Sequence, residues 1–490
     1  MEKKLRVRIL LACGLAVLLA VFLKLNWGEI GYLMGYADYS CQDCNVILIS
    51  VDALRADHMG MYGYGRDTTP YLDGFSEKAV LFENAYTPWP KTTPSFASFF
   101  TGLHPYKTGI ERITLYQWLD EDLVLLPEIL KAQGYSTGGL VTNPSAGNMS
   151  NLDQGFDFLL TRGYNARGAT KYAVKDLKRL DGGRFLYWVH YIDPHTPYSP
   201  GGEYQTMYMN DRHYNGSIEV KICPKDKRFS LQLVSGGWPN DYEKQRKGSI
   251  NSPDVTCTVV SGKTKVLGDY IARYDGEVRK TDDQIGVLLD EIGEMGLMEN
   301  SIIVIWADHG EDLGEHSSYF QHGRLAYNPS LKVPLMIYHP RLKGRRVKSA
   351  VNLIDVFPTL LDMLGLEYPS DGESLKPLML GKEEDRVVFS SAGYAIDYQK
   401  ILTDGRWKLI KVPDEIDRQI MTGGEYELYD LKNDPGEARN IYGMPTEGMY
   451  LKPLMDRFLE EEYRPYDRDR KVVQYGAETA EDLKSLGYIN

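Results

Sequence analysis

The sequence predicts an α/β fold, in which a mostly parallel sheet is sandwiched by helices and a small antiparallel sheet lies near the C-terminus. Continuous apolar runs, typical of strands buried on both faces, alternate with amphipathic helical patterns along most of the chain. From about Asp385 the pattern changes to short strand-like runs separated by turn residues. Hydrophobic residues make up 43% of the 490 residues, which excludes a largely disordered chain and allows a large core.

The expected parallel strands share one feature, an apolar run that leads into polar side chains. They cover residues 45–51, 136–141, 185–189 and 301–306. Helical patterns at 122–133 and 282–295 each close with a glycine, the usual helix stop. In a parallel sheet, ligands sit outside the carboxyl ends of the strands. We therefore expect the site among the polar residues at those ends, which are Asp52, Asn143, His195, Asp308 and His309.

The C-terminal part, residues 385–490, is expected to form a separate subdomain. Its strand-like runs cover residues 387–389, 407–410 and 426–429, and a helical pattern follows at 451–463. We expect the larger domain at 43–384. It contains a polar insertion at about 201–265, whose loops would shape specificity.

The N-terminus, residues 1–30, is typical of a membrane anchor. Four basic residues precede an apolar run at 9–23, and Lys24 and Trp27 follow it where they would lie at the membrane interface. This arrangement keeps the basic end in the cytoplasm and puts the rest of the chain on the extracytoplasmic side. A cleaved signal peptide, which would leave the chain secreted or periplasmic, is the open alternative.

The cysteines are compatible with export. Outside the expected anchor the chain has Cys41, Cys44, Cys223 and Cys257, enough for two disulfides in an oxidising compartment. For Cys41 and Cys44 we expect a disulfide or free thiols, because no second such pair or suitably spaced histidine completes a zinc site. Cys223 with Cys257 would close the polar insertion.

Thr92 is the candidate nucleophile. It stands at the expected first turn of a helix within residues 92–102, where Pro94 suits an early helical position. The N–H groups and the dipole of that turn favour an anion arriving from substrate. A simple helix cap is the competing interpretation, since Thr and Ser commonly precede helices.

Asp52, Asp308 and His309 are the candidate metal ligands. Carboxylate oxygens and an imidazole nitrogen suit zinc, manganese, magnesium or calcium. A divalent cation there would lower the pKa of the Thr92 hydroxyl and polarise a substrate oxygen. The formal net charge of −12 argues against nucleic acid as a partner, whereas an anionic ester remains suitable because a metal reverses the local field.

A second cluster follows the third expected strand. His190, Asp193 and His195 lie within six positions, and His322 stands apart as a further element. Two interpretations of these residues remain open. They either bind a metal or act in acid–base catalysis, or they belong to a solvated loop. We expect the Glu311 side chain to contact the neighbouring metal-ligand candidates and to orient them.

Five motifs in order make the chain similar to a known family. They are residues 45–58, Thr92-x-Pro94-Ser95 with Thr101-Gly102, residues 193–198, residues 306–311, and an ending at 427–435 and 483–488. From Asn45 to the C-terminus the chain thereby resembles the sulfatase family of the alkaline phosphatase superfamily. The resemblance implies that fold, with a metal held by Asp52, Asp308, His309 and the nucleophile Thr92. It also implies that His195 contacts the ester group or helps the leaving group depart, and that His322 faces the same pocket.

The match breaks at the nucleophile. Sulfatases carry Cys or Ser there, oxidised to formylglycine, with Arg four positions on, whereas this chain has Thr92 and Phe96. Threonine cannot give that aldehyde, and the family's lysine–histidine segment is also missing. A threonine at this position instead resembles superfamily members that form a phosphothreonine intermediate. These members are the nucleotide pyrophosphatase/phosphodiesterases and the membrane-anchored phosphoethanolamine and phosphoglycerol transferases. Asn143 would then donate to a phosphoryl oxygen, and a second metal would lie between Asp193, His195 and His322.

The sequence therefore predicts a metal-dependent hydrolase that cleaves phosphoester or sulfate-ester substrates outside the cytoplasm through Thr92. A membrane-anchored transferase of the phosphoethanolamine or phosphoglycerol type, acting on envelope lipid or glycan, is the second hypothesis. A binding protein that has lost catalysis is the third. The expected partners are an anionic ester, including glycan or lipid esters, and the membrane through the anchor, with no nucleic acid.

Overall fold

The structure, a computed structural model, describes residues 40–111, 118–180, 182–209, 267–393, 398–412 and 424–464. The expected anchor at 1–30, Cys223, Cys257 and nearly all of the expected insertion lie outside the described residues. Among the helices that are described, none is long and apolar enough to cross a membrane.

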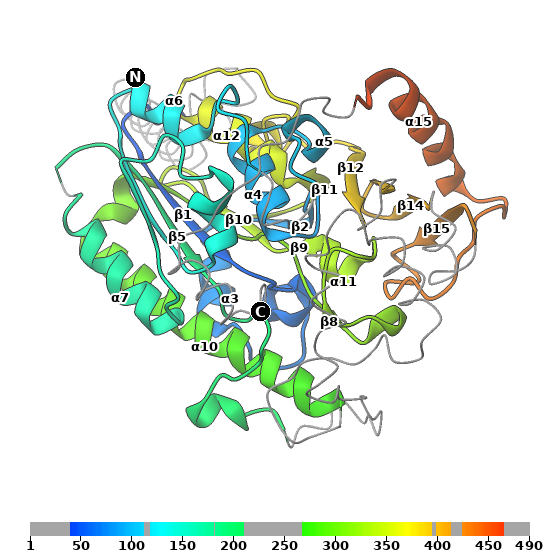
Figure 1. The fold of residues 1–490 in the computed structure, drawn as a ribbon, viewed down its shortest axis with the longest axis horizontal. Helices are drawn as coiled ribbons and strands as arrows, with labels where there is room; N and C mark the ends of the chain where they lie inside the picture. The colour runs from blue at the N-terminus through cyan, green and yellow to red at the C-terminus, as the bar shows by residue number, and fades with distance from the viewer. Residues whose placement is uncertain are drawn as a thin grey trace, which may run out of the picture.

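A nine-stranded sheet forms the centre of the molecule (Figure 1). Its strands follow the order β11–β2–β10–β6–β1–β5–β3–β4, and β9 pairs with β2. β10 runs antiparallel to both of its neighbours, whereas the central pairs β6–β1, β1–β5 and β5–β3 are parallel. The strands are β1 (Asn45–Val51), β2 (Val80–Tyr86), β3 (Ser136–Val141), β4 (Phe158–Thr161), β5 (Phe185–Tyr191), β6 (Ser301–Ala307), β9 (Lys332–Val333), β10 (Leu335–Tyr338) and β11 (Arg345–Asn352).

Helices cover both faces of this sheet. One set packs together beside β3 and β5 and appears at the lower left of Figure 1; it consists of α3 (Pro70–Ser76), α7 (Ala166–Leu177) and α10 (Leu267–Glu294). The other set consists of α4 (Thr92–Thr101), α5 (Pro105–Thr108), α6 (Leu126–Ala132) and α12 (Val356–Met363). Because both faces are covered, every residue of β1, β5 and β6 is buried.

The four predicted parallel strands are confirmed. Those predicted at 45–51 and 136–141 have the observed bounds, and the other two extend by one or two residues as β5 and β6. The sequence did not predict β2, β4, β9, β10 and β11. Glu83 and Asn84 interrupt the apolar run of β2, and β11 is an edge strand with charged residues along it.

The helix bounds differ from the prediction. The helix expected at 122–133 begins only at Leu126, where Glu128 accepts a hydrogen bond from the N–H of Leu125 and closes the first turn. The pattern at 282–295 is the second half of α10. Asp282, which resembles a helix start in the sequence, instead accepts hydrogen bonds from the N–H groups of Tyr71 and Leu72 at the start of α3.

The C-terminal part forms the predicted small antiparallel sheet, seen in orange at the right of Figure 1. Its strand order is β12–β13–β14–β15, and α15 packs on β13 and β14. The helix predicted at 451–463 is α15 followed by a wider π-helical turn at Phe458–Glu462. The elements are β12 (Val388–Ala392), β13 (Gln399–Thr403), β14 (Trp407–Lys411), β15 (Tyr426–Asp430) and α15 (Leu451–Arg457); the sequence did not predict β13.

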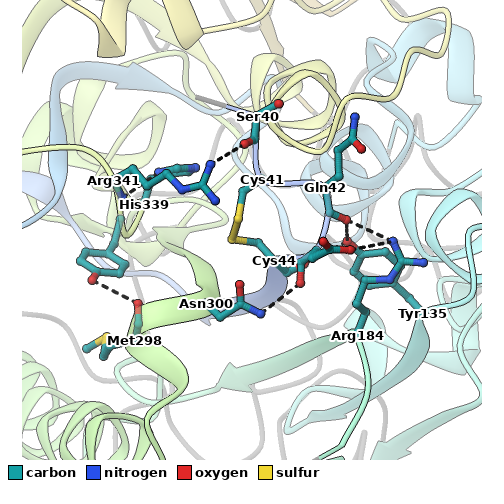
Figure 2. Close-up of a disulfide and its surroundings, with 12 residues drawn as sticks. Ser40, Cys41, Gln42, Cys44, Tyr135, Arg184, Met298, Asn300, His339 and Arg341 are labelled. Carbon is teal, nitrogen blue, oxygen red and sulfur yellow. Dashed lines mark hydrogen bonds and ion pairs between the residues drawn. A yellow bond between two sulfur atoms is a disulfide. The ribbon is translucent and has the colours of Figure 1, made fainter. Parts of the chain in front are cut away.

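A disulfide joins Cys41 to Cys44 directly before β1 (Figure 2). Of the two alternatives for this pair, the disulfide is the one observed. The N–H of Cys41 donates to the carbonyl of Met363, and the Tyr135 hydroxyl donates to the carbonyl of Cys44. These contacts fix the entry of the chain into the central strand.

Candidate active site

The ends of four neighbouring strands bring the candidate site together. In the order β6–β1–β5–β3, these strands lead into Asp308 and His309, Asp52, His195, and Asn143 respectively. β2 runs in the same direction, because it is antiparallel to β10 as β6 is, and its carboxyl end leads into α4. The topology therefore brings the predicted residues to the carboxyl ends of neighbouring strands, and a functional site there stays a prediction.

Asp52, Asp308 and His309 form a compact, fully buried group. A ligand atom from each lies within 4.8 Å of the other two. His309 Nε2 is 3.5 Å from Asp52 Oδ1 and 3.5 Å from Asp308 Oδ2. His309 Nδ1 lies 2.8 Å from the carbonyl of Gly310, so Nδ1 carries the proton and Nε2 offers a lone pair to the group.

The donor set of this group fits a divalent cation. Asp52 Oδ1 and Asp308 Oδ2 are buried and, within the described part of the chain, accept no hydrogen bond. The other oxygen of Asp308 accepts from the N–H groups of Ala53 and His309, so one oxygen is held and the other is directed into the group. Burying a carboxylate oxygen without a partner is costly, and a bound cation removes that cost.

The electrostatics of the carboxylates point the same way. Burial and the nearby charge of Asp52 raise the pKa of Asp308 well above its usual value. Burial disfavours the ionised form of Asp52, but His195, the contact with His190 and His309 outweigh it and hold the pKa of Asp52 well below its usual value. Two carboxylates this close stay ionised together only with a positive charge between them.

Thr92 is the hydroxyl that faces this group. Its Oγ1 lies 3.3 Å from His309 Nε2, at the first residue of α4. The adjacent Thr93 hydroxyl is used elsewhere, since it donates to the carbonyl of Ser145 at 2.9 Å. The structure thus distinguishes two neighbouring threonines, and only Thr92 lies beside the metal-ligand candidates.

His322 and His195 lie against the same group. The His322 ring stacks on His309 with ring centroids 3.9 Å apart, and the His195 ring lies 5.3 Å from that of His322. His322 Nδ1 is 3.0 Å from Glu311 Oε1, and Tyr198 donates to the other oxygen of Glu311. His195 Nδ1 is 2.7 Å from the carbonyl of Thr196. The Nδ1 atom of each ring therefore has a protein partner.

Asp193 and Asn143 are both held by contacts within the protein. Asp193 pairs with Lys280 at 2.8 Å and accepts from the N–H of Ala166 at the start of α7. In the described ranges, the only group of three or more metal-ligand side chains is Asp52, Asp308 and His309, so the second metal at Asp193, His195 and His322 gains no support. Asn143 Nδ2 donates to Asp52 Oδ2 at 2.8 Å; its contact with a phosphoryl oxygen stays a prediction.

Lys91 is a functional candidate that the sequence analysis missed. It directly precedes Thr92 and is only 3% exposed, and burial lowers its pKa to about 7 although Glu311 opposes that shift. Its side chain covers Gly323, beside His322, where an added Cβ would lie 2.3 Å from Lys91 Cε. Its position next to the candidate nucleophile Thr92 was the available signal, but a lysine before a helix is usually solvated.

Comparison with known proteins places these residues in context. The sulfatase family profile matches residues 44–366, and the profile of the C-terminal part of N-sulphoglucosamine sulphohydrolase matches residues 314–463. An ulvan-active sulfatase of Formosa agariphila is 26% identical over 91% of this chain and 83% of its own. An N-acetylglucosamine-6-O-sulfatase of Bacteroides thetaiotaomicron is 26% identical over 87% and 88%. The phosphonate monoester hydrolase of Agrobacterium radiobacter has the same fold, with a TM-score of 0.64, 19% identity, and 88% and 100% coverage.

Proposed function

We propose that this chain, which belongs to the sulfatase family of hydrolases, cleaves phosphoesters with Thr92 as nucleophile and a divalent metal at Asp52, Asp308 and His309. The observation that carries the proposal is the position of Thr92 Oγ1, 3.3 Å from His309 Nε2 in the buried group of metal-ligand candidates. A hydroxyl is a weak nucleophile in water, and a neighbouring cation is one of the few ways to activate it.

Phosphoesters are favoured over sulfate esters by the chemistry of threonine. A formylglycine hydrate releases its sulfate by expelling it from a carbon that carries a second hydroxyl, and threonine has no such second hydroxyl. A threonine ester must instead be cleaved by attack of water on the central atom, a step that phosphorus supports. That a phosphonate monoester hydrolase shares the fold is compatible with this preference.

The residues around Thr92 have separate tasks in this scheme. The bound metal would lower the pKa of the Thr92 hydroxyl and stabilise negative charge on the substrate. Thr92 Oγ1 attacks phosphorus in line with the departing alcohol, and the Thr92 hydroxyl proton passes through Nε2 of His195 or His322 to the oxygen of that alcohol. Water then attacks the phosphothreonine, and its proton passes through the same imidazole to Thr92 Oγ1 as the phosphate is released. Lys91 in its ammonium form binds a non-bridging oxygen.

We further propose that the reaction takes place outside the cytoplasm, on an exported ester of a glycan or lipid. The Cys41–Cys44 disulfide supports an oxidising compartment. The sequence of residues 1–30 supports a membrane anchor with the catalytic domain on the extracytoplasmic side.

The test compares matched nitrophenyl sulfate, phosphate monoester and phosphodiester substrates with the full-length protein in detergent and added divalent metals. We expect metal-dependent cleavage of a phosphoester that Thr92→Ala lowers by about 10³-fold or more. Thr93→Ala is the matched control and should retain most activity, because the Thr93 hydroxyl bonds Ser145 instead. Turnover of the sulfate alone, or an active Thr92→Ala protein, would contradict the proposal.

A further inference from the structure

We propose that His190 is a positioning residue: with Asn143 it holds Oδ2 of Asp52, so that Oδ1 is presented to the metal. The inference rests on the metal site of the proposed function and adds a residue that the family resemblance does not supply. It concerns the geometry of one ligand, and it can be tested by metal binding without turnover.

The two oxygens of Asp52 have different surroundings. Oδ1 lies 3.5 Å from His309 Nε2 and accepts no hydrogen bond from any described residue. Oδ2 points the other way, 2.8 Å from Asn143 Nδ2 and 3.5 Å from His190 Nε2. A carboxylate whose second oxygen is held by donors coordinates through the first oxygen in a fixed direction.

The Asn143 side of this arrangement is fixed by the backbone. Asn143 Oδ1 accepts a hydrogen bond from the N–H of Ser145 at 3.0 Å, as the cap of a short helical turn. The amide therefore has its oxygen toward Ser145 and its nitrogen toward Asp52. Asn143 alone, however, holds Oδ2 of Asp52 from one side only.

His190 supplies the other side. It is the sixth residue of β5 and is fully buried. The Thr142 hydroxyl donates to the carbonyl of His190 at 2.8 Å, and its oxygen lies 3.3 Å from Nδ1, beyond the usual range of a hydrogen bond. Nε2 has no hydrogen bond within the described part of the chain, and Asp52 Oδ2 is the charged atom in front of it. The distance of 3.5 Å is at the outer limit of a hydrogen bond. An N–H buried beside a carboxylate is most stable when it donates to that carboxylate.

Position 96, on α4, supplies no donor to Asp52. Residue 96 follows Thr92 by one helical turn, and Phe96 packs its ring 5.3 Å from the ring of His190. The donors that reach Asp52 in this chain therefore come from the strand ends, through Asn143 and His190.

The decisive experiment measures the metal affinity of two variants at the same position. His190→Leu removes the donor, whereas His190→Gln keeps an amide N–H that reaches the place of Nε2. On the full-length protein, with Zn²⁺ and Mn²⁺ competing against a chromogenic chelator, we expect His190→Leu to weaken binding by about 10- to 100-fold. His190→Gln should stay within about threefold of the wild type. Equal affinity of His190→Leu and the wild type, or equal losses in both variants, would overturn the inference.

A second measurement counts the imidazole ligands of the metal. X-ray absorption of the zinc-loaded wild type and of the zinc-loaded His190→Gln variant should show the same number of imidazole ligands, because His190 acts through Asp52. The loss of one imidazole ligand in His190→Gln would make His190 a direct ligand and overturn the positioning role. A wild type that binds no divalent metal would defeat the proposed function itself, and the inference would fall with it, so the two failures are distinguishable.

Discussion

Lys91 shows how one buried residue links sequence position to chemistry. Its burial lowers its pKa to about 7, so the ammonium form is present below that pH and is lost above it. If this cation binds the substrate anion, kcat/KM of the wild type falls as the pH rises above about 7, because kcat/KM reports the free enzyme.

Removing the cation tests this assignment. We expect Lys91→Met to lower kcat/KM below pH 7 by about 10- to 100-fold, the loss of a hydrogen bond to a charged group. The fall above about pH 7 that depends on Lys91 should disappear in the variant. The check is kcat/KM between pH 5.5 and 9 at saturating metal. A variant whose pH dependence parallels that of the wild type would remove Lys91 from substrate binding.

At the residue scale, the metal-ligand candidates could be predicted from the sequence. The residues that hold those candidates in place could not. Asp52, Asp308 and His309 directly follow buried strands, so the topology alone brings them together. The task of His190 depends on which oxygen of Asp52 faces it. That direction follows from contacts to residues far along the chain, and no sequence pattern records it.

At the element scale, the small C-terminal sheet holds the loop that carries His322. The Gln399 side chain, on β13, accepts from the N–H of Ala326 and donates to the carbonyl of Arg324. The N–H of Gly393 donates to the carbonyl of Gly323, the neighbour of His322. The loop therefore takes its position from a sheet that lies outside the central one.

Because these contacts hold the His322 loop and not the metal-ligand candidates, weakening them should lower catalysis without lowering metal binding. Gln399→Leu leaves the buried N–H of Ala326 without its partner, at a cost of about 1–3 kcal/mol, and loosens the His322 loop. We expect a lower kcat with unchanged metal content, measured by steady-state kinetics and elemental analysis. Gln133→Leu, at the exposed end of α6, is the control and should leave both quantities unchanged. A normal kcat for Gln399→Leu would show that the loop is positioned by other contacts.

Strand prediction succeeded for long apolar runs and failed where a strand is short or carries polar residues. β1 and β6 are buried along their whole length and appear in the sequence as continuous apolar runs. β11, at the sheet edge, alternates buried with exposed charged residues, and β13 contains Gln399 and Lys400, whose burial depends on tertiary partners. Such strands are recognised only after their neighbours are known.

At the scale of the whole molecule, a buried ion pair joins the two sheets. Lys408, on β14, lies 2.6 Å from Glu437, and both side chains are completely buried. Both also bind Asn328, the first residue of α11 (Asn328–Leu331): Lys408 donates to its side chain and Glu437 accepts from its N–H. α11 precedes β9 and β10 of the central sheet, so this contact couples the C-terminal subdomain to the domain that carries the site.

Breaking one half of the pair should destabilise the whole protein. Lys408→Met leaves the carboxylate of Glu437 buried without its cation, which costs about 3–5 kcal/mol, whereas adding Glu437→Gln removes the charge and should recover part of that loss. Lys452→Met, which removes an exposed pair with Asp456, is the control and should cost about 0.5 kcal/mol or less. Urea unfolding followed by tryptophan fluorescence and by loss of bound metal measures both parts. Because the pair couples the two sheets, we expect both signals to shift together in Lys408→Met. A metal signal that keeps its wild-type midpoint would show that the central sheet and its site are stable without the C-terminal subdomain.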